Sequence, residues 1–248
     1  MGVDLRRKVY DDFYEWRNVV NNFNRFDIRS PLLSLLEDNV DLYTCWIREG
    51  QSVFRGRIFN FDNVAKSEEE YLAFINSNEK VFEGYSAKIS GAPPKENATE
   101  GRLNCKGISF LYTSNEPKTV VYELRPIKHE LLSIAEFVTR KDVRFADLRK
   151  RACRRVHENE ALYILLRRIS NEFSRPHYAG HNYWFTQYLA GQFINMGFDG
   201  VVFESSLLPD GDNLVFFYPE DCEAINSHLY RVDKISISFD GISRENLQ

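Results

Sequence analysis

The apolar residues near the start of the chain recur at intervals of three or four positions. They are Tyr10, Phe13, Trp16, Val20 and Phe23. This spacing places them along one face of a helix, so it predicts an amphipathic helix. Ser30 and Pro31 then have the residue types of an N-cap and a first helical position, which predicts a second helix over 32–36.

We therefore interpret residues 1–50 as an all-helical N-terminal extension and residues 51–248 as the main domain. A lone helix of this length is marginal in water, and its apolar stripe needs a permanent cover. No flexible Gly/Ser linker separates the extension from the residues that follow. We expect the extension to pack against the main domain, rather than to pair with another copy or to be a separable docking element.

Beyond position 50, short apolar runs are mixed with helical periodicity. Strands are predicted over 52–60, 108–113, 131–138, 201–204, 214–218 and 235–239. Helices are predicted over 67–76, 147–157, 159–172 and 183–196. The segment 118–124 is compatible with a strand and with a helical turn, and 84–106 forms one long irregular segment. Because the order lacks a regular βαβ rhythm, it predicts an α+β fold.

Composition narrows the class of protein. The 248 residues are 43% hydrophobic and 14% aromatic, which is enough for a sizeable core. A net charge of −4 argues against a protein that binds bulk nucleic acid. No apolar run reaches the ~18 residues of a membrane span, and the first residues lack the apolar core of a secretion signal. The four cysteines are far apart, as in reduced thiols, so we expect a cytoplasmic protein.

Three arginines stand where a fold could gather them. Arg55 and Arg57 flank Gly56 on a predicted strand, and residues two apart share a face of a strand. Guanidinium forks match phosphate oxygens, although surface ion pairs are an equally good explanation. Arg102 lies in Gly-Arg-Leu-Asn-Cys-Lys-Gly, where the glycines permit close backbone approach. This segment is either a loop that contacts phosphate or ribose, or an ordinary turn.

An aromatic, a carboxylate and a hydroxyl follow the arginines. Tyr112 ends one apolar run, Glu123 stands within Val-Val-Tyr-Glu-Leu, and Ser205 follows the run 201–204. We expect Glu123 to be partly buried, either paired with an arginine or functional. An anionic, aromatic ligand whose chemistry develops positive charge would need such a set, and NAD fits this description.

Other motifs are weaker. His177 and His181 have the spacing of a zinc pair, but they lie between proline and glycine without the glutamate of H-E-x-x-H, so no metal is expected. The basic run 149–155 is typical of a solvated helix face, with nucleic-acid contact a minor alternative. Neither a P-loop nor G-x-G-x-x-G after a strand is present, so the common nucleotide-binding folds are not supported.

Taken in order over about 52–221, these motifs resemble the RES-domain family, named for an arginine, a glutamate and a serine. The shared features are the R-x-R strand, G-R-x-N-x-x-G, the Tyr–Glu pair, the helix that carries Tyr183 and Gln187, and Gly-Phe-Asp-Gly before the final serine. The resemblance implies an ADP-ribosyltransferase-like α+β fold with a split β-sheet, with NAD as substrate and no separate cofactor. Many members are toxins held in check by a helix-turn-helix antitoxin.

The resemblance also assigns roles by position. It implies four catalytic residues: Arg55, Tyr112, Glu123 and Ser205. It implies five substrate-binding residues: Arg57, Arg102, Asn104, Tyr183 and Gln187. Glu204 stands where a small residue or proline is more usual in the family, so the choice between Ser205 and Ser206 stays open, although Ser205 fits the spacing better.

The sequence leaves several reactions open. With NAD cleaved at the nicotinamide–ribose bond, water as acceptor gives a glycohydrolase, inorganic phosphate a phosphorylase, and a protein side chain a mono-ADP-ribosyltransferase. A non-catalytic module that binds NAD or ADP-ribose is a further alternative, although a pure binder would not need the carboxylate. A homodimer is compatible with any of these.

Overall fold

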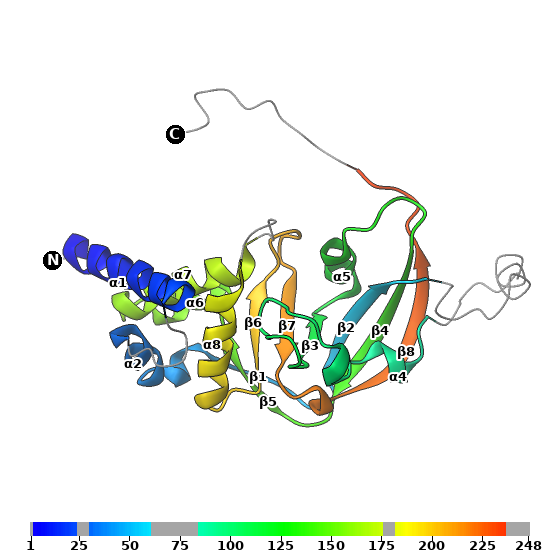
Figure 1. Cartoon of the computed structure of the whole chain (residues 1–248), viewed down its shortest axis with the longest axis horizontal. Coiled ribbons are helices and arrows are strands. Elements are labelled where there is room, and N and C mark those ends of the chain that lie inside the picture. The colour runs from blue at the N-terminus through cyan, green and yellow to red at the C-terminus, as the bar shows by residue number, and fades with distance from the viewer. Residues whose placement is uncertain (1, 24–29, 61–83, 176–181, 237–248) are drawn as a thin grey trace, which may run out of the picture.

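The computed structural model describes residues 2–23, 30–60, 84–175 and 182–236. Its centre is an eight-stranded mixed sheet in the order β1-β5-β6-β7-β3-β2-β4-β8 (Figure 1). In chain order the strands are β1 Thr44–Ile47, β2 Ser52–Ile58, β3 Leu111–Ser114, β4 Leu131–Thr139, β5 Val143–Asp147, β6 Gly200–Glu204, β7 Asp212–Phe216 and β8 Cys222–Arg231. The helices are α1 Gly2–Asn22, α2 Pro31–Glu37, α4 Ala87–Ser90, α5 Pro117–Leu124, α6 Lys150–Cys153, α7 Glu160–Ser174 and α8 Trp184–Asn195. The α+β prediction is confirmed.

The sheet is almost divided between β2 and β3. These two strands share a single register position, Phe54 opposite Ser114, whereas β2 pairs with β4 over its whole length. The expected split sheet therefore consists of β1-β5-β6-β7-β3 on one side and β2-β4-β8 on the other. Unpaired strand ends at such a division leave room for a cleft.

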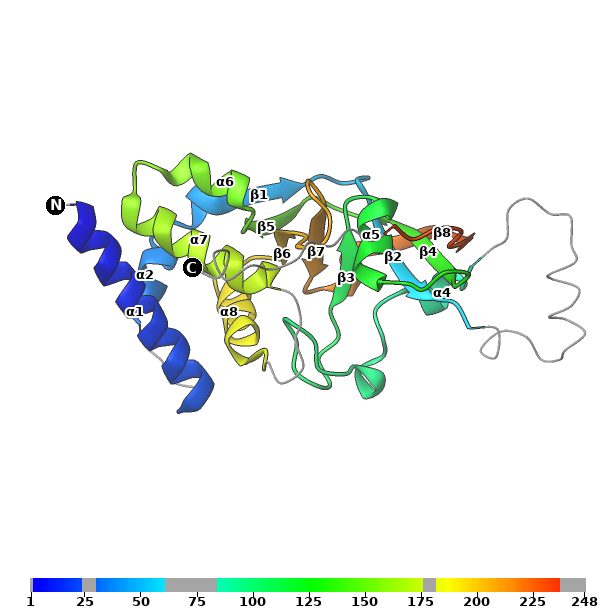
Figure 2. The ribbon, with the colours of Figure 1, turned by 90° about the horizontal axis from the view of Figure 1, so that it is seen from above.

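Helix α5 lies against β2 and β3 beside this division (Figure 1, Figure 2). A Cβ atom at Gly56 would stand 2.3 Å from Val120 Cγ1, so only glycine lets the helix come this close to β2. The segment 118–124 is thus helical, because Glu116 occupies the cap position and Pro117 the first turn, which proline favours.

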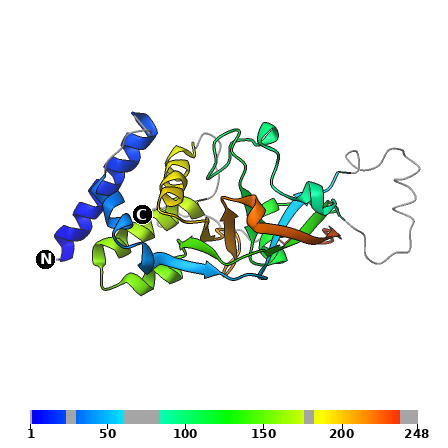
Figure 3. The same cartoon turned by 90° about the horizontal axis from the view of Figure 1, so that it is seen from below.

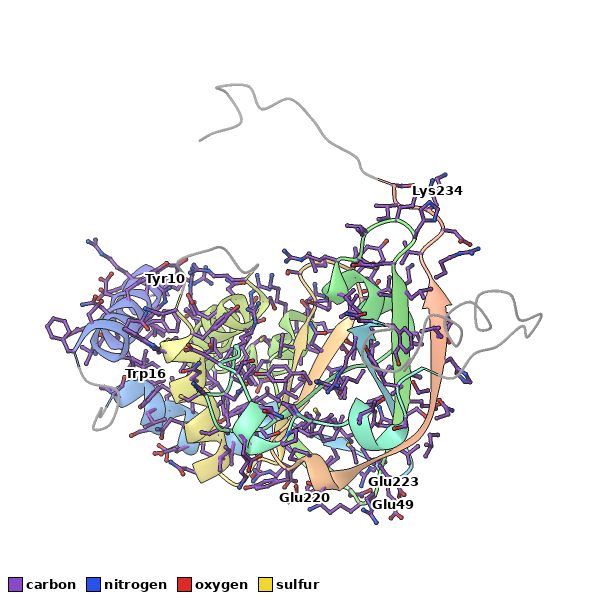
Figure 4. All side chains as sticks on the ribbon, turned by 45° about the vertical axis from the view of Figure 1, so that its right-hand side comes forward. Tyr10, Trp16, Glu49, Glu220, Glu223 and Lys234 are labelled. Atoms are coloured by element: carbon purple, nitrogen blue, oxygen red, sulfur yellow. The ribbon has the colours of Figure 1, made fainter. Side chains whose placement is uncertain are left out.

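The N-terminal helices form one end of the molecule together with α6, α7 and α8 (Figure 1, Figure 3). Phe13 and Trp16 are buried, and each ring packs edge-on against Phe185 of α8 at 5.5 and 5.3 Å. Figure 4 shows Trp16 on the side of α1 that faces α8. The prediction that residues 1–50 pack against their own domain is confirmed.

Two members of the predicted stripe are not in this core. Phe23 is 78% exposed because α1 ends at Asn22, and Tyr10 is only partly covered. Val9 takes the buried position one residue earlier. The helix was therefore predicted correctly, but its buried face is rotated slightly toward Val9.

The all-helical interpretation of residues 1–50 is wrong at its end. Residues Thr44–Ile47 form β1, which pairs antiparallel with β5 along its four positions. Strand β5 was also missed, because Asp147 was assigned to a helix that in fact begins at Lys150. Four- and five-residue strands have too few positions for a clear alternation, so their mutual pairing defines them.

Strand β8 was missed as well. Its sequence mixes polar residues with isolated apolar ones, yet nine of its ten residues pair with β4. The strand predicted over 235–239 is wrong for 235 and 236, which lie beyond the end of β8, and its other residues are outside the described ones. The predicted helix at 67–76 and the His177–His181 pair also lie outside the described residues.

Two arginines of the basic run 149–155 form internal ion pairs. Arg149 donates to both carboxylate oxygens of buried Asp147 at 2.7 Å, and to Asp212 at 3.0 Å. Arg151 also pairs with Asp212. The charges of these two arginines are therefore already balanced within the fold. No described helix is long and apolar enough to cross a membrane.

Candidate active site

A cleft with an accessible volume of about 230 Å³ opens at the division of the sheet. Strands β2, β3, β6 and β7, helix α5, the end of α7 and the loop before β3 all contribute to it. Its lining includes Phe54, Arg55, Gly56, Arg102, Tyr112, Ser114, Glu123, Phe173, Glu204, Ser206 and Asn213. The structure thus brings residues of the R-x-R strand, the Gly-Arg-Leu-Asn segment and the Tyr–Glu pair to one place.

Glu123 lies in the last turn of α5 and reaches toward the ends of β6 and β7. Its Oε1 accepts a hydrogen bond from Ser205 Oγ at 2.7 Å and another from Asn213 Nδ2 at 2.7 Å. The expectation that Glu123 is partly buried is wrong, because the side chain is exposed at the rim of the cleft. Glu123 is exposed because it lies in the last turn of a helix and not in a central strand. The carboxylate is held by hydrogen bonds and is open to a ligand.

Ser205 has no free hydrogen-bonding capacity. Its Oγ donates to Glu123 and accepts from the backbone N–H groups of Leu207 and Leu208, at 3.1 and 3.2 Å. A hydroxyl has one donor and two acceptor sites, so all three are used. Ser205 therefore orients Glu123 and is not placed as a nucleophile. Ser206 is the neighbour whose side chain is exposed and lines the cleft.

Tyr112 presents its ring to the cleft but not its hydroxyl. The hydroxyl donates to Asn104 Oδ1 at 2.7 Å and accepts from the Leu103 backbone N–H at 3.0 Å. Burial raises the pKa of Tyr112 to about 12, so the phenol stays neutral at physiological pH. The hydroxyl ties β3 to the Gly-Arg-Leu-Asn loop and is not available for proton transfer to a ligand.

Replacing Gly101 by alanine is expected to disorder this loop. A Cβ atom at Gly101 would stand 2.5 Å from Asn104 Oδ1 and 2.9 Å from the Tyr112 hydroxyl, so the bond between them must break. We expect a loss of roughly 1–3 kcal/mol in the free energy of unfolding, measured by urea denaturation. Alanine at Gly91, which has open space around it, is the control. Equal stability of Gly101→Ala and wild type would contradict this role for the loop.

Arg55 forms no ion pair with any carboxylate that the structure describes. Its Nη1 donates to the Tyr112 carbonyl at 3.1 Å, and its buried Nε has no partner among the described residues. Burial, together with the neighbouring charge of Arg57, lowers the pKa of Arg55 to about 10. The guanidinium is still protonated at neutral pH, so an anion in the cleft would relieve an unfavourable buried charge.

Arg102 lines the same cleft from the loop before β3. Its Nη1 donates to the carbonyl of Phe173 at 2.6 Å, at the C-terminal end of α7, where a cation is favoured. Burial lowers the pKa of Arg102, while Tyr183 and Glu123 act in the opposite direction. Arg102 therefore lies within electrostatic reach of the carboxylate that Ser205 and Asn213 hold.

The other predicted binding residues are not part of the cleft lining. Arg57 donates to the Gly91 carbonyl at 3.0 Å and is not part of the lining. Asn104 is buried and donates to three carbonyls of its own loop, while Gln187 of α8 donates to the carbonyls of Gly101 and Asn104. Tyr183 lies with its ring 5.7 Å from the Arg102 guanidinium carbon. These residues shape the loop that carries Arg102.

Two further residues, Asn213 and Ser114, complete the site. The segment Asn213-Leu-Val fits the family pattern, but the sequence assigned no role to Asn213 and did not single out Ser114. The amide of Asn213 bridges Glu123 and Ser114. Its Nδ2 donates to Glu123, and its Oδ1 accepts from Ser114 Oγ at 2.9 Å. A polar residue at the start of an otherwise apolar strand was the available signal. It could not be interpreted without knowing that β7 begins beside α5.

The arginines predicted to bind the substrate form no ion pair with another described residue. Within the described ranges, Arg55, Arg57 and Arg102 form no ion pair, and neither do Arg125, Arg154, Arg167 and Arg168. Ten other arginines do: Arg6, Arg7, Arg17, Arg48, Arg140, Arg144, Arg149, Arg151, Arg175 and Arg231. Among those same residues there is no group of three His, Cys, Asp or Glu side chains that could hold a metal. The cleft combines unpaired positive charge with one oriented carboxylate.

Comparisons with known proteins bear on the family of this chain. No curated protein sequence matches it. A chain in the crystal structure of the M. tuberculosis MbcT–MbcA toxin–antitoxin complex aligns with 80% of this chain and 92% of its own length, at 11% identity and a TM-score of 0.43. The model of the RES domain matches residues 78–240, which include Arg102, Tyr112, Glu123 and Ser205 but not Arg55 or Arg57. The match begins later than the resemblance expected from 52 onward, and it covers well over half of the sequence. The chain belongs to the RES-domain family.

Proposed function

We propose that this protein consumes NAD by cleaving the bond between nicotinamide and ribose. The observation that carries the proposal is the pairing of an oriented carboxylate with unpaired arginines across one cleft. Glu123 is held by Ser205 and Asn213, and neither Arg55 nor Arg102 has an anionic partner among the described residues. NAD would bring a negatively charged pyrophosphate to the arginines, and a ribose that becomes positively charged during the reaction to the carboxylate.

The chemistry follows from where charge develops. Loss of neutral nicotinamide leaves an oxocarbenium-like ribose, and a nearby carboxylate stabilises it electrostatically. Glu123 Oε2 has no hydrogen-bond partner among the described residues, so it is the oxygen that we assign to the ribose. The ring of Tyr112 would pack against the ribose or the nicotinamide. With its hydroxyl occupied, Tyr112 acts by packing alone.

We assign the pyrophosphate to both cleft arginines. Arg102 is supported by its place within the RES match and by its electrostatic interaction with Glu123. Arg55 is supported by its unpartnered Nε and lowered pKa, although it precedes the matched residues. Contacts to phosphates remote from the reacting bond can position the substrate and contribute to catalysis. Arg57 adds positive potential without touching the ligand.

The acceptor and the biological setting extend this proposal. We favour water or inorganic phosphate over a protein side chain, as in NAD-depleting members of the family. The protein would then be a growth-inhibiting toxin acting in the cytoplasm, restrained by a helix-turn-helix antitoxin.

The decisive experiment is incubation of the purified protein with NAD, with and without phosphate, followed by chromatographic separation of the products. Nicotinamide with ADP-ribose indicates hydrolysis, and a phosphorylated ADP-ribose indicates phosphorolysis. No nicotinamide in either incubation would contradict the proposal.

Arg55→Ala should mainly impair substrate capture. Loss of one charged hydrogen bond to a phosphate is expected to weaken binding by roughly 1.5–3 kcal/mol, seen as a raised KM for NAD in steady-state kinetics. Folding should not suffer from loss of the charge, because the buried guanidinium has a lowered pKa and no anionic partner among the described residues. Arg48→Ala, which removes an exposed arginine paired with Asp142, is the control. Unchanged KM and kcat in Arg55→Ala would remove Arg55 from the site.

A further inference from the structure

Asn213 is the cleft residue that contacts the carboxylate of Glu123 from the sheet. It is the second residue of β7, opposite Phe203 of β6 and Ser114 of β3. Its amide has two partners in the cleft, Ser114 Oγ at 2.9 Å and Glu123 Oε1 at 2.7 Å. An ionised carboxylate only accepts hydrogen bonds, so the amide must turn Nδ2 toward Glu123 and Oδ1 toward the serine. The side chain therefore has one orientation that satisfies both neighbours.

The two carboxylate oxygens of Glu123 differ in their hydrogen bonds. Oε1 accepts from Asn213 on one side and from Ser205 on the other, both at 2.7 Å. Oε2 has no hydrogen bond to any residue that the structure describes. Two donors, one in β7 and one in the loop after β6, fix the rotation of the carboxylate about its own axis, which a single donor could not do. One oxygen is thereby anchored, and the other is left for a ligand.

The strand end that carries Asn213 is itself held in place. Asp212, the preceding residue, is buried and pairs with Arg149 and Arg151, and its backbone N–H donates to Asn115 Oδ1 at 2.9 Å. Arg149 also binds both oxygens of Asp147, whose side chain is fully buried. Buried, hydrogen-bonded ion pairs of this kind hold a single geometry because breaking them leaves uncompensated charge. Asn213 thus projects from a fixed point.

We propose that Asn213 is a positioning residue for Glu123, which works together with Ser205 to hold Oε1 and aim Oε2 at the ribose. This inference rests on the proposed NAD-cleaving function for its kinetic consequence, but not for its geometry. The assignment explains why an exposed glutamate on a short helix could act in one defined orientation. It also explains the polar residue at the start of β7.

The first test separates binding from turnover. Asn213→Ala removes the donor, and Asn213→Asp keeps the shape but places a second carboxylate beside Glu123. We expect kcat for nicotinamide release to fall about 10- to 100-fold in Asn213→Ala and further in Asn213→Asp, with KM within about twofold of wild type. An unchanged kcat in both variants would overturn the proposal, and so would a change confined to KM.

A matched control lies elsewhere in the sheet. Asn226 of β8 donates to Glu136 Oε2 at 2.9 Å, while Ser52 donates to the other oxygen at 2.6 Å. Neither Asn226 nor Glu136 lines the cleft. Asn226→Ala removes a similar amide–carboxylate bond, so its effect on melting temperature should match that of Asn213→Ala while kcat stays at the wild-type value. An equal loss of kcat in Asn226→Ala would show that general destabilisation causes the effect.

The second test does not depend on activity. Crystal structures of wild type and both Asn213 variants should show Glu123 rotated away from Ser205 in the variants, or spread over several conformers. An unmoved, singly ordered Glu123 in both variants would overturn the positioning role. If wild type releases no nicotinamide, the proposed function fails by itself, and the crystal structures still decide whether Asn213 orients Glu123.

Discussion

Glu123→Gln is expected to reduce nicotinamide release from NAD by roughly 10²- to 10³-fold while leaving the fold intact. Glutamine keeps an oxygen that can accept from Ser205 and Asn213, so the side chain can stay where it is. What it loses is the negative charge that would stabilise the oxocarbenium-like ribose. Since Glu123 is exposed and forms no ion pair within the described residues, its loss should hardly change the melting temperature.

Three measurements check this prediction. Nicotinamide release is followed by chromatography, binding of ADP-ribose by calorimetry, and folding by thermal denaturation. Glu136→Gln provides the matched control, because Glu136 is likewise held by a serine and an asparagine but lies outside the cleft. Wild-type turnover in a folded Glu123→Gln protein would remove Glu123 from the reaction. Loss of turnover in Glu136→Gln would point to an indirect effect on folding.

Trp16→Ala should reduce the stability of the protein more than any substitution in the cleft. The indole is 3% exposed and packs edge-on against Phe185 and Tyr188 of α8, at ring distances of 5.3 and 5.9 Å. Truncating a buried tryptophan removes this contact and leaves a cavity, which costs about 3–5 kcal/mol in the free energy of unfolding. Urea denaturation monitored by circular dichroism measures the loss.

Phe23→Ala is the control, because this ring belongs to the same predicted stripe but is 78% exposed. Its effect should stay within about 0.5 kcal/mol. Deleting residues 1–45 should go further and yield insoluble or markedly less stable protein, because it removes α1, α2 and half of β1 from the shared core. A soluble deletion variant with an unchanged melting temperature would contradict an integral role for the N-terminal segment.

The local signals in the sequence were reliable where one short segment contains all the interacting groups. Ser30 caps α2 through a hydrogen bond from the Leu32 N–H, as its place before Pro31 predicted. Asn159 caps α7 in the same way, at the predicted start of that helix. The stripe with Phe13 and Trp16 correctly indicated a helix in need of a partner surface. In each case the relevant groups lie within a few turns of one helix.

Short and polar strands could not be predicted in this way. Strands β1 and β5 have few positions, and β8 alternates poorly, so their backbone hydrogen bonds come from segments far away in the chain. The position of Glu123 was misjudged for a related reason. Its apolar neighbours suggested partial burial, but Pro117 opens a helix that places Glu123 in an exposed last turn.

The sequence by itself determined the family, the α+β class and the side chains Arg55, Arg102, Tyr112 and Glu123 of the cleft. These depend on residue identity and order, which are visible without a fold. Only the tertiary structure decided how they are used. Ser205 and Asn213 meet Glu123 across 82 and 90 positions of sequence, and no local periodicity encodes such a bond. The structure thus shows that the Tyr112 hydroxyl and the Ser205 hydroxyl are both occupied, and that one oxygen of Glu123 is anchored while the other has no hydrogen bond to a described residue.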